Sequence, residues 1–155
     1  MPTIEDAIVL ATESHRGQTD KAGLPFILHP LRVMARFLAS EDGDARMVAV
    51  LHDVIEDSDV TCAMLLERGY PRAVVDALEA ISRTEGERYG AYIERVAANP
   101  LAVRVKLADL QDNLDSRRPS TQGLLPDEVY RYRAAHSYLW GLPVRQAAED
   151  SLRNL

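Results

Sequence analysis

Apolar residues recur three and four positions apart along almost the whole chain, which is the spacing that lines one face of a helix. No segment shows the strict alternation of apolar and polar residues that is typical of a half-buried strand, and there is no internal repeat. The sequence therefore predicts an all-α protein, a helical bundle. Helices are expected from Ile4 to near Gly17, from His29 to Leu38, from the break at Asp42–Asp44 through Asp57, from Thr61 to Gly69, from Pro71 to Ile81, from Tyr89 to Ala98, from Pro100 through Asp115, from Asp127 to Leu139 and from Pro143 to Asn154, with a long loop from Ser116 to Pro126.

Length and composition narrow the class of protein. The 155 residues are 46% hydrophobic and 27% charged, which fits one globular domain over residues 1–155. The net charge of −6 without a basic cluster argues against a nucleic-acid partner. No run of about 18 apolar residues and no signal-peptide pattern occurs, so we expect a cytoplasmic protein with no membrane partner. Its single cysteine excludes an internal disulfide.

The stretch from Leu51 to Asp57 concentrates polar chemistry. Read as a helix, it spaces His52 from Glu56, and Asp53 from Asp57, by four residues, so the four side chains share one surface. Acids at the C-terminal end of a helix meet the negative end of its dipole, at a cost of about 0.3–1 kcal/mol each. A bound cation is the simplest means of neutralising them. A solvated acidic face with one surface histidine is the alternative.

Two further residues are spaced to join such a cation site. His29 stands at the entrance of one predicted helix, and Asp109 lies within another, on the same face as Lys106 and Asn113. Bundles build metal sites from inward side chains on facing helices, and two nitrogens with two oxygens suit Mn²⁺, Fe²⁺ or Zn²⁺. Taken singly, His29 also reads as a helix-cap histidine and Asp109 as an exposed acid, although the apolar flanks of Asp109 favour burial.

These residues carry a resemblance to a known family. His29, His52-Asp53 and Asp109 reproduce the H…HD…D order of the HD-domain metal-dependent phosphohydrolases. Three longer segments resemble the RelA/SpoT-type alarmone hydrolase domain: Ser14–Gln18 with Lys21–Pro30, Leu51–Ser58, and Val105–Asp109 with Asn113. The motifs lie in order between residues 11 and 118. The chain thus resembles a stand-alone small alarmone hydrolase with an HD-domain helical bundle and without a synthetase or regulatory domain.

The resemblance implies a reaction and a set of site residues. The reaction is removal of the 3′-diphosphate from a nucleoside 3′,5′-bis-diphosphate, (p)ppGpp, with one Mn²⁺ ion. The implied roles are metal ligation by His29, His52, Asp53 and Asp109, catalysis by Glu56 and Asp57, and substrate contact by Lys21, Asn113 and Tyr132. His15 belongs to the family motif and reads as a structural hydrogen-bonding residue.

Some positions depart from the family pattern. Asp20 stands where the family usually has an arginine that stacks on guanine, and Ala22 replaces the usual serine. Leu110 and Asp112 replace other residues that the family often shows. These departures weaken the expectation of guanine specificity, so the expected substrates extend to (p)ppApp. An acid near the base accepts two hydrogens from guanine but only one amine from adenine, and it would repel nearby phosphates. Arg117 and Arg118 either complement a helix dipole or bind phosphate.

Two other functions remain open. One is an HD-family phosphohydrolase that acts on another phosphorylated nucleotide. The other is a catalytically silent module that senses nucleotides. Retention of Lys21, Glu56, Asp57 and Asn113 favours the alarmone hydrolase over both.

Overall fold

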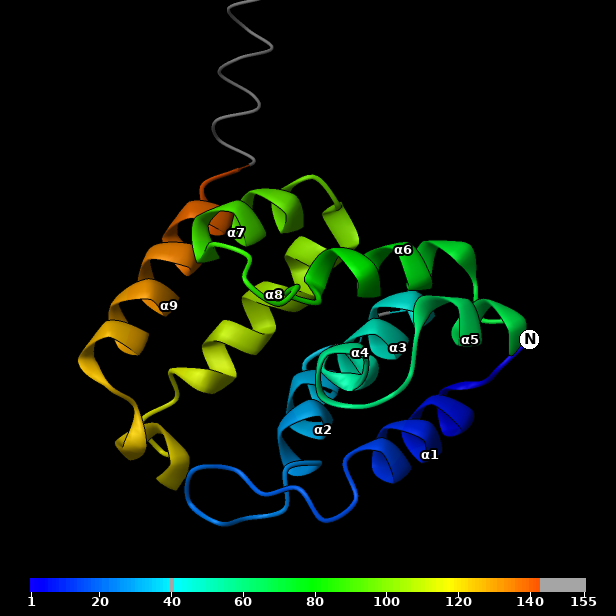
Figure 1. Ribbon diagram of the computed structural model, residues 1–155, viewed down its shortest axis with the longest axis horizontal. Coiled ribbons are helices and arrows are strands. Elements are labelled where there is room, and N and C mark those ends of the chain that lie inside the picture. Colours follow the sequence, from blue (N-terminus) through cyan, green and yellow to red (C-terminus); the bar gives the residue numbers. More distant parts are fainter. Residues whose placement is uncertain (40, 143–155) are drawn as a thin grey trace, which may run out of the picture.

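The computed structural model describes residues 1–39 and 41–142, and it is helical throughout this part of the chain (Figure 1). Apart from one isolated bridge between Thr19 and Pro25, these residues form no β-structure, so the prediction of an all-α fold is confirmed. The predicted helix at 143–154 lies outside the described residues. The helices are α1 (Ile4–Ser14), α2 (Leu28–Ala35), α3 (Gly43–Leu51), α4 (Val54–Asp57), α5 (Cys62–Glu67), α6 (Arg72–Ile81), α7 (Tyr89–Ala97), α8 (Pro100–Asn113) and α9 (Pro126–Trp140), with a 3₁₀ turn η1 (Pro119–Gly123).

Side-chain caps begin several of these helices. Thr3 accepts a hydrogen bond from the backbone of Asp6, and the Asp6 carboxylate accepts one from the backbone of Thr3, forming a capping box. Asp42, Thr61 and Asn99 cap α3, α5 and α8 in the same way, each through one side-chain oxygen. The predicted helix starts therefore reflect local chemistry that the structure uses.

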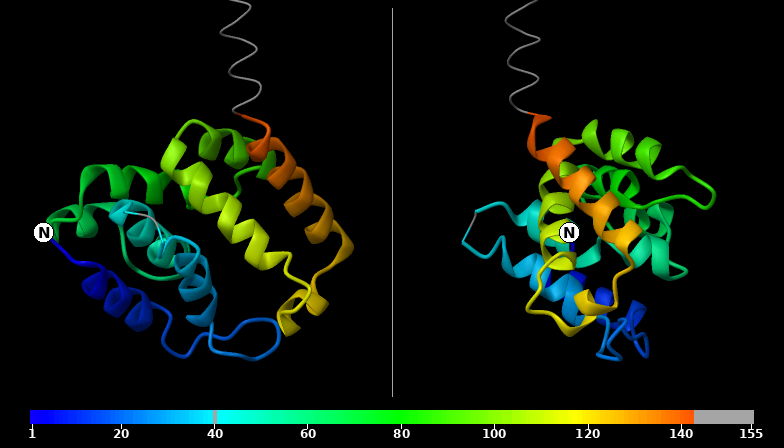
Figure 2. Two further views of the ribbon diagram at one scale, coloured as in Figure 1. Left: turned by 180° about the vertical axis from the view of Figure 1, so that it is seen from behind. Right: turned by 90° about the vertical axis from the view of Figure 1, so that its left-hand side faces the viewer.

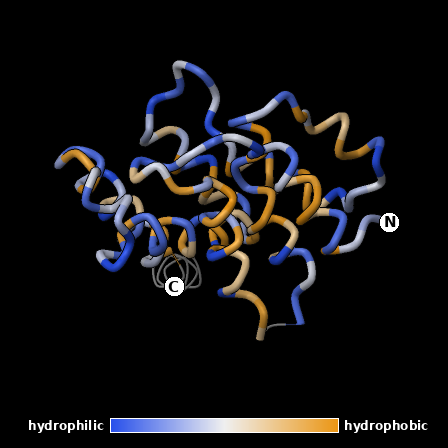
Figure 3. The backbone as a smooth tube through the Cα atoms, turned by 90° about the horizontal axis from the view of Figure 1, so that it is seen from below, coloured by the Kyte–Doolittle hydropathy of each residue, from blue (hydrophilic) through white to orange (hydrophobic). Residues whose placement is uncertain are grey.

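Helices α3 and α8 form the centre of the molecule. Helix α3 packs against α1, α2, α6 and α8, while α8 also contacts α7 and α9. The residues Val48–Leu51 of α3 are fully buried. Two further views show α8 and α9 side by side, with α2 also packed against α8 and α1 on the side of the molecule away from α9 (Figure 2). Hydrophobic segments gather in the interior and hydrophilic loops lie at the edges (Figure 3).

The continuous helix predicted through Asp57 is wrong, because α3 ends at Leu51. His52 is the C-cap of α3, and Asp53 is the N-cap of α4. Helix α4 begins at Val54 and consists of a single turn. Nδ1 of His52 contacts the carbonyl of Ala49 at 2.8 Å, and this carbonyl is the acceptor that the N–H of Asp53 would use in a continuing helix. The His52 side chain therefore takes the place of a helical hydrogen bond at the break. Glu56 and Asp57 lie in the single turn of α4.

Smaller differences appear elsewhere. Helix α2 starts at Leu28, so Pro30 lies within its first turn, and it ends at Ala35 instead of Leu38. The expected loop from 116 to 126 contains η1. Among the described residues, no helix is both long enough and apolar enough to cross a membrane.

Candidate active site

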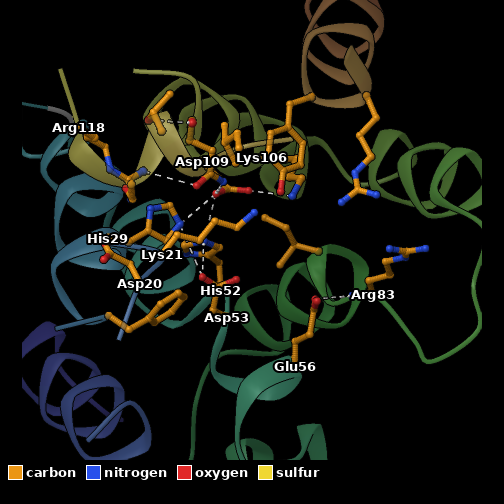
Figure 4. A pocket seen from close by; sticks show the side chains of 18 of the residues that line it. Asp20, Lys21, His29, His52, Asp53, Glu56, Arg83, Lys106, Asp109 and Arg118 are labelled. Atoms are coloured by element: carbon orange, nitrogen blue, oxygen red, sulfur yellow. Dashed lines mark hydrogen bonds and ion pairs between the residues drawn. The ribbon is translucent and has the colours of Figure 1, made fainter. Parts of the chain in front are cut away.

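Four predicted residues converge from three parts of the fold (Figure 4). His29 comes from α2, His52 and Asp53 from the junction of α3 and α4, and Asp109 from α8. Ligand atoms of His29, His52 and Asp53 lie within 4.8 Å of one another. Oδ1 of Asp109 lies 3.0 Å from Nε2 of His29 and 3.6 Å from Nε2 of His52. Atoms that share an ion at about 2.1 Å are separated by roughly these distances.

Hydrogen bonds orient both imidazole rings toward the point of convergence. Nδ1 of His52 lies 2.8 Å from the carbonyl of Ala49, and Nδ1 of His29 lies 2.7 Å from Oδ2 of Asp112. Because each Nδ1 donates to an oxygen, each Nε2 presents a lone pair to the carboxylates of Asp53 and Asp109. Nε2 of His52 is buried without a hydrogen bond, although Oδ2 of Asp53 is 3.1 Å away. These acceptor atoms fit a divalent cation between them.

The buried imidazoles and carboxylates of the site shift one another's pKa values. Burial opposes a charged imidazole, yet the carboxylates of Asp53 and Asp109 raise the pKa of His52 well above its usual range. Burial acts the other way on Asp109, but the ammonium of Lys106 and the two imidazoles hold the pKa of this carboxyl well below its usual range. The site therefore demands positive charge, which a divalent ion would supply in place of protons on the histidines.

Both carboxylate oxygens of Asp109 accept hydrogen bonds from side chains of its own helix, α8. Lys106 donates to Oδ2 at 2.7 Å, and Asn113 donates to Oδ1 at 2.7 Å. The three residues share a face of α8, as their spacing predicted. Asn113 also lines the cleft described below, so its amide could serve both Asp109 and a substrate.

Asp112 supports the other side of the site, a role that the sequence analysis missed. It is 2% exposed and contacts the ring of His29. Its carboxylate also accepts from Nε of Arg32 at 3.0 Å and from Nη1 of Arg118 at 2.6 Å. Asp112 stands three residues after Asp109, and this spacing indicated that the two share a face of α8. The contact with His29 could not be inferred, because His29 lies 83 positions away in sequence.

The convergence point opens into a cleft of about 380 Å³. The predicted substrate contacts Lys21, Asn113 and Tyr132 all line it. Nζ of Lys21 forms an ion pair with Glu128 of α9, at 2.6 Å, which ties the loop before α2 to the opposite wall. Asp20 also lines the cleft, but its carboxylate accepts hydrogen bonds from the backbone of its own loop.

The two predicted catalytic acids differ in position. Glu56 lines the cleft, and its Oε2 accepts a hydrogen bond from the backbone N–H of Arg83 at 2.9 Å. Asp57 is exposed and does not line the cleft, while its backbone carbonyl accepts from Gln18 at 2.9 Å. Desolvation and the nearby charges of Asp53 and Glu56 raise the pKa of Asp57 to about 6.

The remaining predicted residues fall into two groups. Arg118 lines the cleft, whereas Arg117 is exposed and pairs with Asp115. His15 is buried and contacts Gln18 at 2.8 Å, consistent with a structural role. Cleft residues that the sequence analysis missed include Arg83, Tyr89, Tyr92 and Arg131. No local motif marks them, because tertiary packing of α7 and α9 brings them together.

Fold and site together define an all-helical domain with a candidate metal centre in a cationic cleft.

No protein-family model matches the chain. A guanosine-3′,5′-bis(diphosphate) 3′-pyrophosphohydrolase of Aquifex aeolicus is 31% identical over 120 residues, which cover 72% of this chain and 17% of the relative. One of Haemophilus influenzae is 31% identical over 92% of this chain and 23% of its own length. The bifunctional (p)ppGpp synthase/hydrolase SpoT of Escherichia coli is 29% identical over 81% of this chain and 20% of its own length.

A solved structure shows the same fold. It belongs to a metazoan ortholog of SpoT described as hydrolysing ppGpp, with a TM-score of 0.71 and 24% identity over 90% of this chain and 85% of that one. The chain spans only about a fifth of the length of the curated relatives it matches. These comparisons support a RelA/SpoT-type hydrolase domain.

Proposed function

We propose that this domain removes the 3′-diphosphate from nucleoside 3′,5′-bis-diphosphates, with (p)ppGpp as the principal substrate. The observation that carries the proposal is the convergence of two imidazole nitrogens and two carboxylates in a cleft with several cationic side chains. The similarity to the pyrophosphohydrolase of Aquifex aeolicus and to SpoT of Escherichia coli supports the same reaction. A silent sensing module would not need to retain both the complete ligand set and the acid that faces the cleft.

In this proposal His29, His52, Asp53 and Asp109 hold one divalent ion, Mn²⁺ by resemblance to the family. When bound, such an ion polarises a phosphoryl oxygen and lowers the pKa of a water molecule. Lys106 and Asn113 fix the orientation of Asp109, and Asp112 fixes that of His29.

Glu56 is the residue that we assign to proton transfer. Its carboxylate faces the cleft and is oriented by the backbone N–H of Arg83, so it can accept the proton of an attacking water. The water oxygen bonds to the phosphorus nearest the ribose, the bond from that phosphorus to the 3′ oxygen breaks, and the 3′ oxygen takes up a proton. The products are pyrophosphate and a nucleoside 5′-diphosphate or 5′-triphosphate. Asp57 supports this step from outside the cleft.

The substrate contacts are assigned to side chains that line the cleft. Lys21 and Asn113 are assigned to the phosphates and ribose, and Tyr132 lies beside the nucleotide. Adenine is the second candidate base, because Asp20 replaces the arginine that the family usually stacks on guanine. Oδ1 of Asp20 accepts both hydrogen bonds from the backbone of its own loop, which leaves Oδ2 for a ligand.

Product analysis tests the reaction. The protein is incubated separately with ppGpp and ppApp in Mn²⁺, with EDTA as the control. We expect pyrophosphate and the corresponding nucleoside 5′-diphosphate, both lost on chelation, and the two rates rank the bases. Turnover of neither compound would overturn the proposal in favour of another phosphorylated nucleotide.

Two variants separate metal binding from proton transfer. Glu56→Gln should lower kcat by about 10²-fold or more while Mn²⁺ still binds, because only proton transfer is lost. Asp53→Ala should lose both turnover and Mn²⁺ binding. Glu85→Gln, an exposed acid in a surface turn, is the matched control. Full activity in Glu56→Gln would remove this residue from the mechanism.

A further inference from the structure

The cationic side chains of the cleft divide into those with a close carboxylate partner and those without one. Lys21 pairs with Glu128, Lys106 with Asp109 and Arg118 with Asp112, each at 2.7 Å or less. Arg83 and Arg131 differ. Within residues 1–39 and 41–142, no carboxylate lies within 4.0 Å of the Arg83 guanidinium, and the one near Arg131 is 3.9 Å away.

Neighbouring residues leave both guanidiniums without a carboxylate at hydrogen-bonding distance. Arg83 donates from Nε and Nη2 to the carbonyl of Glu87, a neutral acceptor, while the Glu87 carboxylate is occupied by Arg95 and Thr84. The Glu128 carboxylate near Arg131 is occupied on both oxygens by Lys21. Nε of Arg131 is buried without a hydrogen-bond partner. A buried donor without a partner is costly, so Nε of Arg131 would gain from an acceptor. The rest of the Arg131 side chain is partly exposed, and Arg83 keeps Nη1 for a ligand.

Both guanidiniums lie over the same aromatic ring. The guanidinium carbons of Arg83 and Arg131 are 5.7 Å and 5.4 Å from the ring centre of Tyr89. The Tyr89 hydroxyl is buried and also lacks a hydrogen-bond partner. All three residues line the cleft. Because guanidiniums already occupy the ring, it is poorly placed to stack on a base. The Tyr89 hydroxyl, Nη1 of Arg83 and the guanidinium of Arg131 remain as donors for an oxyanion.

Arg83 lies on the far side of the cleft from His29 of the candidate metal centre, and from Asp20 and Arg118, with Glu56 beside it (Figure 4). We propose that Arg83, Arg131 and Tyr89 form a second anion subsite, which takes the 5′-phosphates of a nucleotide whose 3′-diphosphate faces the metal centre. The inference rests on the proposed function for the identity of the ligand, but the donor cluster is independent of the metal ligands.

Nucleotides without a 3′-phosphate test the subsite separately from the reaction. Affinities of guanosine, GMP and GDP are measured by calorimetry in EDTA, so that no metal ion recruits their phosphates. Guanosine carries no phosphate and is the reference. We expect GMP and GDP to bind the wild-type protein more tightly than guanosine does, and adenosine, AMP and ADP to show similar ratios. Arg83→Gln and Arg131→Gln should each weaken GDP binding by about tenfold, with little change for guanosine.

Matched controls lie close to both residues. Arg88→Gln changes an exposed arginine of the same loop, and Arg133→Gln changes an exposed arginine two residues along α9. Neither should alter the ratio of GDP to guanosine affinity. Tyr89→Phe, which removes only the hydroxyl, should weaken GDP binding by a few-fold. It also keeps the test valid if an arginine variant folds poorly by circular dichroism.

Hydrolysis of ppGpp supplies the second readout. Loss of the subsite should raise KM and leave kcat nearly unchanged, because the backbone N–H of Arg83 that orients Glu56 is retained. Equal GDP affinity in wild type and variants would overturn the subsite, as would a parallel loss of guanosine and GDP binding. If the subsite responds as expected but ppGpp is not cleaved, the reaction assignment fails and the anion subsite stands.

Discussion

The carboxylate of Asp112 links the candidate metal ligand His29 to two arginines, Arg32 and Arg118. It fixes the ring of His29 and is itself held by Arg32 and Arg118. In Asp112→Asn one acceptor oxygen remains to serve three donors, so we expect affinity for Mn²⁺ to fall about 10–100-fold. Calorimetric titration of the EDTA-stripped protein measures this effect. Asp115→Asn, which changes an acid paired with exposed Arg117, should leave affinity unchanged; an equal loss in both variants would contradict the positioning role.

Asp57 makes the free energy of unfolding depend on pH. Its folded-state pKa of about 6 exceeds the ordinary value of 3.8, so the folded state holds this proton more tightly than the unfolded state. The resulting stabilisation is present below pH 3.8 and is lost as the pH rises through 6. In EDTA, Asp57→Asn should therefore be about 1 kcal/mol more stable than wild type at pH 7.5, allowing for solvent screening, and nearly equal to it at pH 4.

Urea denaturation at the two pH values measures the difference for Asp57→Asn. Asp59→Asn is the control, because it removes an exposed acid two residues further along the chain. A gain for Asp57→Asn that is the same at both pH values would show that the carboxyl charge is not its cause.

At the scale of the element, α8 carries both Asp109 and Asp112 and depends on a side-chain cap. Oδ1 of Asn99 accepts from the backbone of Ala102 at 3.0 Å, and Pro100 occupies the first turn. Asn99→Ala should lower the free energy of unfolding by about 1 kcal/mol, because a backbone donor loses its partner. Urea denaturation measures the loss. Asn99→Asp keeps an acceptor oxygen and should recover most of the stability; an equal loss in that variant would exclude capping as the reason.

The elements also show how far sequence reasoning reaches. Caps and shared helix faces depend on neighbours three or four residues apart, so the starts of α1, α5 and α8 and the grouping of Lys106, Asp109 and Asn113 could be predicted. The break after α3 was missed because the amphipathic pattern continues across it. Contacts such as His29 with Asp112 and Lys21 with Glu128 join residues 83 and 107 positions apart, and no local pattern encodes them.

For the whole molecule, the metal centre acts as a cross-link between separate parts of the fold. Its four candidate ligands come from α2, the α3–α4 junction and α8, which pack together only in the folded state. An ion that binds only the folded state stabilises it by about 2.7 kcal/mol at a hundred times its Kd. Mn²⁺ at that concentration should raise Tm by about 5–10 °C. Calorimetry should find no such rise in Asp53→Ala; an equal rise there would place the ion elsewhere.

The order in which the site residues occur along the chain has a consequence for protein synthesis. The candidate metal ligands are complete at Asp109, and their supporting residues are complete at Arg118. Arg131 and Tyr132, which complete the wall of the cleft, lie on α9 and leave the ribosome later. A nascent chain that folds from its N-terminus is therefore expected to acquire a site for the ion before it acquires one for the nucleotide, so loading of the ion can precede any exposure to substrate.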